Sequence, residues 1–600
     1  MQAILENLFR FEDTCHVYVI RSGETAVLVD FGNGDVLDHL STLGVNQVAA
    51  VLMTHHHRDQ GQGLARAVAA GIPIWVPHTE QDLFRAVDAH WQARPIFNNY
   101  NMRQDRFSLL ESVPIAGTLQ DYAEYEFGGL RFTILPTPGH TTGSITLLAE
   151  INGRRVAFTG DLIAAPGQVW SMAATQWSYN GAEGVAASIP ALLDLKAQAP
   201  ATLLPSHGDP ITTPGPAIDL LIERFWRLLR LRGQNPRLFE LHEHPYGTIT
   251  PHLLQHRASV ANTYVLLSER RTALLIDFGY DFVTGEASGS DRASRRPWLH
   301  TLPALKAQFG VDRIAVVMPT HYHDDHVAGI NLLRQVEKTE HWAAESFADV
   351  LENPTRYDLP CLWYDPIPVD RHLPLETPIQ WEEYTLTLHP LPGHTLYAVA
   401  IEFEVDGHRV LATGDQYQGD DGLELNYVYP NRFRLGDYAQ SAALYRRIRP
   451  DIILSGHWNP LWVTPDYFDQ LEAMGAELDA LHRDLQPLEP DLGAEGFLAR
   501  LTPYQALAHS GQAVTFQVEV RNPFPRPAEA TLTIVVPAGW QGDGPLALAL
   551  PPSGTGTASF CVTPPAGFAE RRARIAVDLT IAGRRFGQQA EALLSAGTIS

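Results

Sequence analysis

The chain has 600 residues, of which 45% are hydrophobic and 9% aromatic, so it has material for several packed domains. Lys and Arg number 44 against 68 Asp and Glu, and the resulting formal charge of −24 disfavours nucleic acid as a partner. The three cysteines, Cys15, Cys361 and Cys561, lie far apart and argue against a disulfide framework.

The first twenty residues, MQAILENLFRFEDTCHVYVI, carry acidic side chains within an apolar run and have no basic leader. This pattern predicts a first pair of strands and not a signal peptide. No apolar stretch of the sequence approaches the roughly 18 residues that a membrane-crossing helix needs. We therefore expect a cytoplasmic protein without a membrane partner.

The first part of the chain alternates strand signals with short polar motifs. CHVYVIRSGETAVLVDFGNG (15–34) predicts a hairpin that ends in Asp-Phe-Gly, and AAVLMTHHHRDQ (49–60) predicts a strand followed by a histidine cluster. Three further landmarks follow: LPTPGHTTGS (135–144), FTGDLI (158–163) and LLPSHGDP (203–210). Thr213-Pro214 then opens a predicted helix, with Thr213 at the N-cap. The apolar stripe of this helix is expected to pack on a sheet and comprises Ile218, Leu221, Ile222, Phe225, Leu228 and Leu229.

The same landmarks recur in the same order farther along the chain. They are ANTYVLLSERRTALLIDFGYD (261–281), IAVVMPTHYHDDH (314–326), PLPGHTLYA (390–398), ATGDQY (412–417), ILSGHWNP (453–460) and Thr464-Pro465. Six matched landmarks in one order indicate a tandem duplication, with units at 1–235 and 245–486. The second copy carries an insertion near TGEASGSDRASRRP (284–297), which predicts an exposed loop with solvated basic residues.

From about residue 499 the sequence pattern changes to strict alternation of apolar and polar residues, interrupted by Pro and Gly. Val514, Phe516, Val518 and Val520 form one such run, and Ile575, Val577, Leu579 and Ile581 form another. Short half-buried strands of this kind predict an all-β, Ig-like sandwich over 499–600. The segment has no cluster of histidine or acidic residues, so we expect an accessory module.

The histidine motifs have the composition of metal sites. In an extended loop, alternate side chains point to the same side, so His321, His323 and Asp325 face one point, with His326 beside them. Imidazole and carboxylate suit Zn²⁺, Fe or Mn²⁺. His394, Asp415 and His457 follow later apolar strands, and the first half has the equivalents His55, His57, Asp59, His140, Asp161 and His207. The step from histidine to aspartate is 21 residues in both copies, from 140 to 161 and from 394 to 415.

HxHxDH followed by PGHT, TGD and a late GH resembles the metallo-β-lactamase-fold superfamily over two complete copies. The resemblance implies an αββα sandwich in each copy, with metals at the sheet edge. It implies that one metal in the second copy is held by His321, His323 and His394, and another by Asp325, His326 and His457, with Asp415 as the bridge. Two Zn²⁺ ions there would share an activated water, and Asp325 would orient it and carry a proton; Asp59 is the corresponding residue of the first copy.

Each copy departs from the family pattern at different positions. In the first copy Gln60 stands where the motif has its last histidine, so the resemblance implies an intact site at His55, His57, His140 and Asp161 and a weakened one at Asp59, Gln60 and His207. One or two ions are therefore expected there, and a histidine at position 60 should add metal. The second copy keeps every ligand but has polar and aromatic neighbours that are candidate substrate-pocket residues: Tyr322, Tyr397, Tyr417, Trp458 and Asn459.

The preferred interpretation is a metal-dependent hydrolase of a small ester, lactone, thioester or related substrate, with its main centre in the second copy. Zinc is the expected metal, with iron or manganese as alternatives. A mononuclear-iron, sulfur-oxidising oxygenase of the same fold is the second interpretation, and a non-catalytic metal-bound scaffold is the third. A nuclease is disfavoured by the charge. A small molecule is the expected partner, and self-association into a homo-oligomer is compatible with the sequence.

Overall fold

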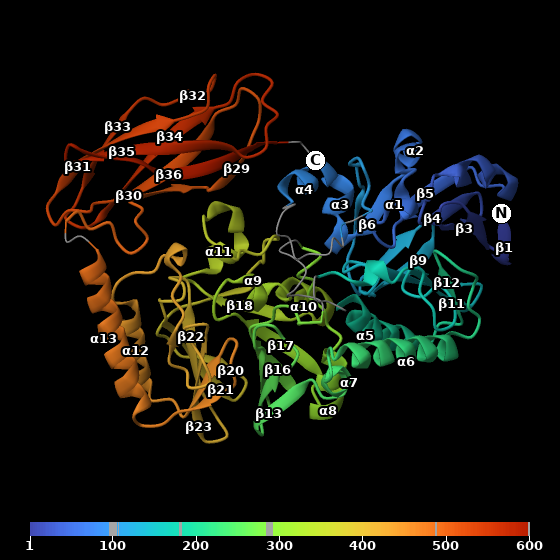
Figure 1. Ribbon diagram of the computed structural model, residues 1–600, viewed down its shortest axis with the longest axis horizontal. Helices are drawn as coiled ribbons and strands as arrows, with labels where there is room; N and C mark the ends of the chain where they lie inside the picture. The colour runs from blue at the N-terminus through green and yellow to red at the C-terminus, as the bar shows by residue number, and fades with distance from the viewer. Residues whose placement is uncertain (95–104, 106, 179–182, 284–291, 487–488, 598–600) are drawn as a thin grey trace.

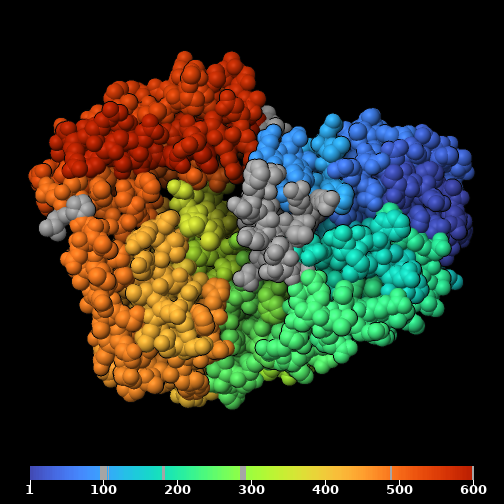
Figure 2. Space-filling model, viewed as in Figure 1, coloured from blue at the N-terminus to red at the C-terminus, as the bar shows by residue number. Residues whose placement is uncertain are grey.

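The computed structural model describes residues 1–94, 105, 107–178, 183–283, 292–486 and 489–597. Within these ranges the chain forms two mixed α/β units followed by an all-β unit (Figure 1). The all-β unit lies over the second α/β unit and reaches toward the first, so the molecule is a single compact body (Figure 2). None of the helices in the described ranges combines the length and apolar character needed to cross a membrane.

The first half contains two sheets. The seven-stranded sheet runs in chain order through β1 (Gln2–Leu5), β2 (Leu8–Glu12), β3 (His16–Ser22), β4 (Thr25–Val29), β5 (Gln47–Leu52), β6 (Ile74–Pro77) and β7 (Gly117–Leu119). The five-stranded sheet has the order β12 (Thr202–Pro205), β11 (Arg154–Gly160), β10 (Ile145–Ile151), β9 (Leu130–Pro136) and β8 (Glu124–Phe127). Strands β4 to β7 are parallel, so their carboxyl ends meet at one edge.

Side chains that alternate along the strands of the first half pack into two layers, one between the sheets and one under the outer helices. In β3, Tyr18 and Ile20 face the core between the two sheets, while Val17 and Val19 face the helices outside. The outer layers include α2 (Leu64–Ala69) and α4 (Val87–Ala93) on one side, and α5 (Glu183–Ala197) and α6 (Pro214–Arg232) on the other. Helices outside and sheets inside give the four-layer αββα arrangement.

Helix α6 begins at Pro214 after Thr213 and ends before Gly233, which has φ 66°. Its stripe packs against the five-stranded sheet and α5, and of the predicted residues only Leu228 is half-buried. A short helix, α7 (Leu238–Glu243), then leads to the second half. The corresponding helix of the second half, α13 (Tyr467–Leu485), has Asp466 and not Thr464 at its N-cap, so the predicted start is two residues early.

The second half repeats the arrangement. Its seven-stranded sheet contains β13 (Tyr246–Thr250), β14 (Leu253–His256), β15 (Tyr264–Leu267), β16 (Thr272–Ile276), β17 (Arg313–Met318), β18 (Glu340–Ala344) and β19 (Arg371–Leu373). Its six-stranded sheet contains β20 (Ile379–Trp381), β21 (Tyr384–Pro390), β22 (Val399–Val405), β23 (His408–Gly414), β26 (Ile452–Ser455) and β27 (Leu461–Trp462). The principal helices are α8 (Leu302–Phe309), α9 (Asp324–Val327), α10 (Ile330–Glu337), α11 (Ala348–Glu352), α12 (Asp437–Ile448) and α13.

The insertion in the second half differs from its prediction. Residues 284–291 lie outside the described residues, but Arg292, Ser294 and Arg296 are buried, with exposures of 9%, 0% and 0%. The expectation of an exposed loop with solvated basic residues is therefore wrong for residues 292–296. Arg292 and Arg296 donate hydrogen bonds to carboxylates and carbonyls at the contact between the two halves. These bonds offset the cost of removing the guanidinium groups from water.

The C-terminal unit has two packed sheets. One contains β28 (Ala499–Thr502), β30 (Val514–Arg521), β34 (Thr555–Thr563) and β32 (Gln541–Gly542). The other contains β29 (Gln505–Ala508), β36 (Arg584–Ala596), β35 (Ala573–Ile581), β31 (Ala528–Val535) and β33 (Leu546–Leu550). The alternating residues of β30 and β35 face a shared core, as a sandwich requires.

Candidate metal centres

The predicted ligands of the second half all follow strand ends at one edge of its two sheets. His321 and His323 lie between β17 and α9, and His394 follows β21. Asp415 follows β23 and His457 follows β26, two strands that run parallel. Parallel strands deliver their carboxyl ends to a common edge, so segments more than one hundred residues apart meet there.

The distances in this second centre place two groups of ligands around one carboxylate. Candidate ligand atoms of His321, His323, His394 and Asp415 lie within 4.8 Å of one another, and so do those of Asp325, His326 and His457. Asp415 joins the groups, because Oδ1 lies 3.3 Å from His326 Nε2 and Oδ2 lies 3.2 Å from His457 Nε2. Asp415 Oδ2 is also 3.6 Å from His394 Nε2.

Hydrogen bonds on the far side of the rings orient these histidines. Asp277 Oδ2 is 2.9 Å from His326 Nδ1, and the carbonyl of Val260 is 3.1 Å from His457 Nδ1. Asn431 is buried; its Nδ2 lies 3.2 Å from His323 Nε2 and donates to the carbonyl of His394 at 3.1 Å. The acceptors Asp277 and Val260 fix the ring orientation of His326 and His457 and leave Nε2 of each ring for a metal.

Burial sets the charge of the inner histidines. It lowers the pKa of His323 to about 3 and holds that of His321 well below its usual value, so both rings are neutral at pH 7. A neutral imidazole is the form that binds a metal. For His457 burial also opposes the charge, but hydrogen bonds that its ring donates to Asp325 and Asp415 outweigh burial and raise the pKa to about 10.

The first centre is built from the equivalent segments. His55, His57 and His140 have candidate ligand atoms within 4.8 Å of one another. Asp161 Oδ2 lies 3.2 Å from His140 Nε2 and 3.8 Å from His55 Nε2. His207 Nε2 lies 3.0 Å from Asp59 Oδ2, so the predicted residues of both groups come together here as well.

The replacement of the motif's last histidine by Gln60 is accompanied by a second difference between the halves, at Ser206 and Gly456, which the sequence analysis did not connect with it. In the second half, Asp277 Oδ2 accepts from the ligand His326; in the first half, the equivalent Asp30 Oδ2 accepts from Ser206 Oγ at 2.7 Å. The position equivalent to Ser206 is Gly456. A Cβ there would lie 1.9 Å from Asp415 Oδ1 and 2.9 Å from His326 Cε1.

The complete ligand set of the second half therefore requires glycine at position 456. In the first half serine is tolerated because no histidine stands at position 60. Gln60 Nε2 instead lies 3.4 Å from His207 Nε2. A histidine introduced at position 60 would find its outer acceptor, Asp30 Oδ2, already taken by Ser206.

The presence of Gln60 in one half and His326 in the other also gives the central carboxylates, Asp161 and Asp415, different pKa values. Burial raises the pKa of Asp161 to about 7, and His207 offsets only part of that effect. Burial acts on Asp415 too, but His326 and His457 outweigh it and hold its pKa well below the usual value. The centre with the extra imidazole thus keeps its central carboxylate, Asp415, ionised.

Both centres fit metal ions by an independent criterion. Nε2 of His55 and of His321, and Oδ1 of Asp161, are buried and have no hydrogen-bond partner among the described residues. Unpaired buried polar atoms are costly, and here they converge with other nitrogen and oxygen donors. A cation that accepts their lone pairs would remove that cost. The mixed imidazole and carboxylate donors suit zinc, iron or manganese.

The predicted pocket residues of the second half separate into two groups. Trp458 and Asn459 line, with His457, a cavity of about 560 Å³, and Tyr397 is half-buried. Tyr322 and Tyr417 are 1% and 4% exposed, so the prediction that they line a pocket is wrong. Tyr322 donates to Asn431 Oδ1 at 3.0 Å, and Tyr417 packs in the core beside Tyr438.

Several supporting residues were not assigned a role from the sequence. Asp30 and Asp277 belong to the repeated Asp-Phe-Gly, and this recurrence in both copies was the available signal. Asn431 ends the 3-10 helix Tyr429–Asn431, which lies outside the six matched landmarks. Trp170, which stacks on His207 at 4.3 Å between ring centroids, also has no repeated counterpart.

Comparison with known proteins shows which family model this chain matches and which proteins it is similar to. The family model described as "Metallo-beta-lactamase superfamily" matches residues 10–207 and 256–457. An uncharacterised protein of Mycobacterium tuberculosis (strain ATCC 25618 / H37Rv) is 28% identical over 174 residues, which cover 25% of this chain and 67% of that protein. A probable metallo-hydrolase of Streptococcus pyogenes serotype M6 is 25% identical over 152 residues, covering 25% of this chain and 61% of that protein.

Solved structures give distant likenesses. A class B3 di-zinc metallo-beta-lactamase from an Alaskan soil metagenome is 17% identical, with 40% of this chain and 94% of that chain covered and a TM-score of 0.31. A beta-lactamase from Chitinophaga pinensis is 18% identical, with 40% and 95% covered and a TM-score of 0.30.

Proposed function

We propose that this chain, which belongs to the metallo-beta-lactamase superfamily in both of its halves, hydrolyses a small ester, lactone, thioester or related substrate, mainly at the second centre. Metal-dependent hydrolysis is the general chemistry that the family and a probable metallo-hydrolase relative support. The observation that carries the choice of centre is His326, whose Nε2 lies 3.3 Å from Asp415 Oδ1, because the first half has Gln60 at the equivalent position.

His321, His323 and His394 would hold one ion, and Asp325, His326 and His457 the other, with Asp415 between them. Ions bound there would lower the pKa of a water toward neutrality and polarise the scissile carbonyl oxygen. We propose zinc, on the basis of the donor set.

Asp325 is the group best placed to handle the proton. Its side chain is 19% exposed, and its Oδ2 lies 3.3 Å from His457 Nε2. A carboxylate at the open side of the site is able to take the proton of the attacking water and return it to the leaving group. Trp458 and Asn459, in the adjoining cavity, would contact the substrate.

The first centre would act as a differently tuned site. Its three histidines form one ligand group, while Gln60 replaces the imidazole of the other. A single tightly held ion is the expected content. If that ion were iron, a sulfur-oxidising reaction would become the better account of this half.

The test uses the full chain, elemental analysis and a panel of esters, lactones and thioesters. His323→Ala or Asp415→Ala should abolish hydrolysis, whereas the matching His57→Ala or Asp161→Ala should reduce it less. Greater damage from the first-half variants would reverse the assignment. Iron content with oxygen uptake, and no hydrolysis by the wild type, would replace the proposed reaction altogether.

A further inference from the structure

We infer that residues 292–296 of the second half form a strap that positions the metal-binding loops of both halves and makes the first centre dependent on the second half. Arg296 is fully buried and reaches into the first half. Its Nη1 donates to the carbonyls of Thr142 at 2.7 Å and Ser144 at 3.0 Å. Its Nε and Nη2 donate to Asp121 at 3.0 and 2.7 Å.

The two carbonyls belong to the loop that presents His140. Glu80 holds the other side of that loop, because it accepts from Thr141 Oγ1 at 2.5 Å and from the backbone N–H of Gly143 at 3.0 Å. A Cβ on Gly143 would lie 2.1 Å from Glu80 Cγ, so the approach is close. The loop is thus clamped between Glu80 of its own half and Arg296 of the other.

The second half supports the corresponding loop with its own residues. Asn431 donates to the carbonyl of His394, and Gln416 Oε1 accepts from the His394 N–H at 3.2 Å. The dependence is therefore one-sided: a residue of the second half completes the first centre, whereas the hydrogen bonds of the His394 loop within the described residues all stay in the second half.

The neighbouring residue of the strap faces the second centre. Arg295 pairs with Asp324, which stands between His323 and Asp325 in the histidine motif. Tyr280 OH donates to the same carboxylate at 3.4 Å. Adjacent residues of one segment therefore contact a metal-binding loop in each half.

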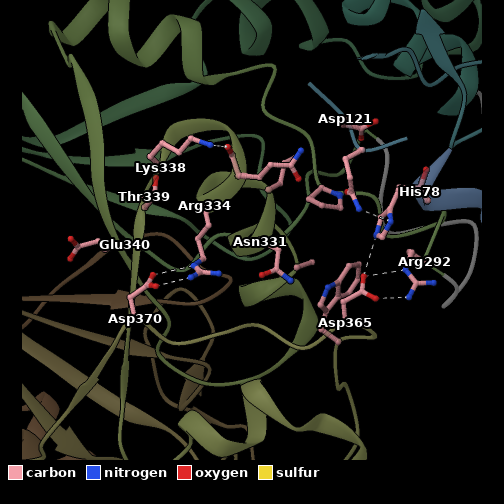
Figure 3. Close-up of a pocket in the computed structure, with 17 residues that line it drawn as sticks. His78, Asp121, Arg292, Asn331, Arg334, Lys338, Thr339, Glu340, Asp365 and Asp370 are labelled. Carbon is pink, nitrogen blue, oxygen red and sulfur yellow. Dashed lines mark hydrogen bonds and ion pairs between the residues drawn. The ribbon is translucent and has the colours of Figure 1, made fainter. Parts of the chain in front are cut away.

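Arg292 anchors the strap without touching either loop. It donates to Asp82 of the first half at 2.8 Å and to Asp365 of the second at 2.7 Å. Figure 3 shows Arg292 and His78 on either side of Asp365, at one end of a cavity of about 610 Å³ between the halves. Arg292 is consequently a matched control, since it shares the interface and the strap but not the loop contact.

The test measures zinc affinity by competition with a chromophoric chelator in the full chain. In a His323→Ala, His326→Ala, Asp415→Ala, His457→Ala background, which removes ligands from both groups of the second half, the remaining zinc reports the first centre. Arg296→Met should weaken that zinc affinity by roughly 10–100-fold, the usual effect of losing an outer partner of a ligand. Arg296→Lys keeps the charge but cannot make the forked contacts, so it should also weaken binding. Arg292→Met should lower the Tm and leave the zinc affinity unchanged.

The second arm tests Arg295→Met in a His57→Ala, His140→Ala background, where zinc affinity of the second centre should fall. Thermal unfolding in excess chelator checks that each variant is folded. Unchanged zinc affinity in Arg296→Met, or an equal loss in Arg292→Met, would overturn the inference. It rests on the proposed metal binding and not on hydrolysis, so a failed substrate panel would leave this result readable.

Discussion

The sequence pattern alone predicts that Gln60→His adds metal to the first half, but the structure predicts that it rebuilds a second ion site there only if Ser206 is changed to glycine as well. The reason lies in the geometry of the second half, where a Cβ at position 456 would overlap Asp415 Oδ1 at 1.9 Å and press on His326 at 2.9 Å. Ser206 carries that Cβ, and its hydroxyl occupies the acceptor that a histidine at 60 would need.

The single variants should each lose stability. Gln60→His forces a ring into space bounded by Ser206, and overpacking of this kind costs about 1–3 kcal/mol. Ser206→Gly removes one donor from the fully buried Asp30, which keeps Thr54 as a partner, and a hydrogen bond to a charged group is worth about 1.5–3 kcal/mol. In the double variant the new histidine supplies the donor that Ser206 gave up, so the two losses should not add.

The assay is metal content per chain after dialysis against a weak chelator, together with Tm, for the two single variants and the double variant. Only the double variant should gain an ion. The mirrored change, Gly456→Ser, should lose metal from the second half. If Gln60→His alone gains as much metal as the double variant, Ser206 does not control the site and the reasoning is refuted.

Three further outcomes are expected. Asn431→Ala should weaken zinc binding of the second centre by roughly 10–100-fold in chelator competition, because two ligand-bearing segments lose their support; unchanged binding would contradict its role. His457→Ala should lower the metal content by one ion per chain, since the other ligand group stays intact, and loss of both ions would argue against separate groups. His256 is buried with a pKa lowered to about 3, so stability is lost as the pH falls below 6.5, where the unfolded chain binds the proton first. His256→Leu should therefore reduce the destabilisation between pH 7 and pH 5 by about 2 kcal/mol, measured as the shift in Tm, and an unchanged shift would show that His256 does not titrate in this way.

The sequence was sufficient for the parts of this protein that are locally encoded. The duplicated strands and the alternating strands of the sandwich follow from periodicity over a few residues, and the αββα class follows from the resemblance of the combined motifs to a known family. The ligands could be picked out because each sits in a short motif at a strand end, and because the copies share order and spacing. Position 60 was visible as a departure for the same reason.

The tertiary structure decided what surrounds those ligands. Tyr322 and Tyr417 follow ligand residues in sequence, yet they turn into the interior, because direction along a loop depends on packing and not on spacing. The basic residues at 292–296 have the composition of a solvated loop, and only the docking of two halves buries them.

The pairing of Gln60 with His207, and of Arg296 with Thr142 and Ser144, joins residues separated by about 150 positions. Hydrogen bonds between residues this far apart produce no periodic pattern in the sequence, because the two partners become neighbours only once the chain has folded. The sequence by itself determined which side chains are able to bind metal. The folded chain determined which partners surround those side chains in each half, and it placed Arg296 of the second half against the His140 loop of the first.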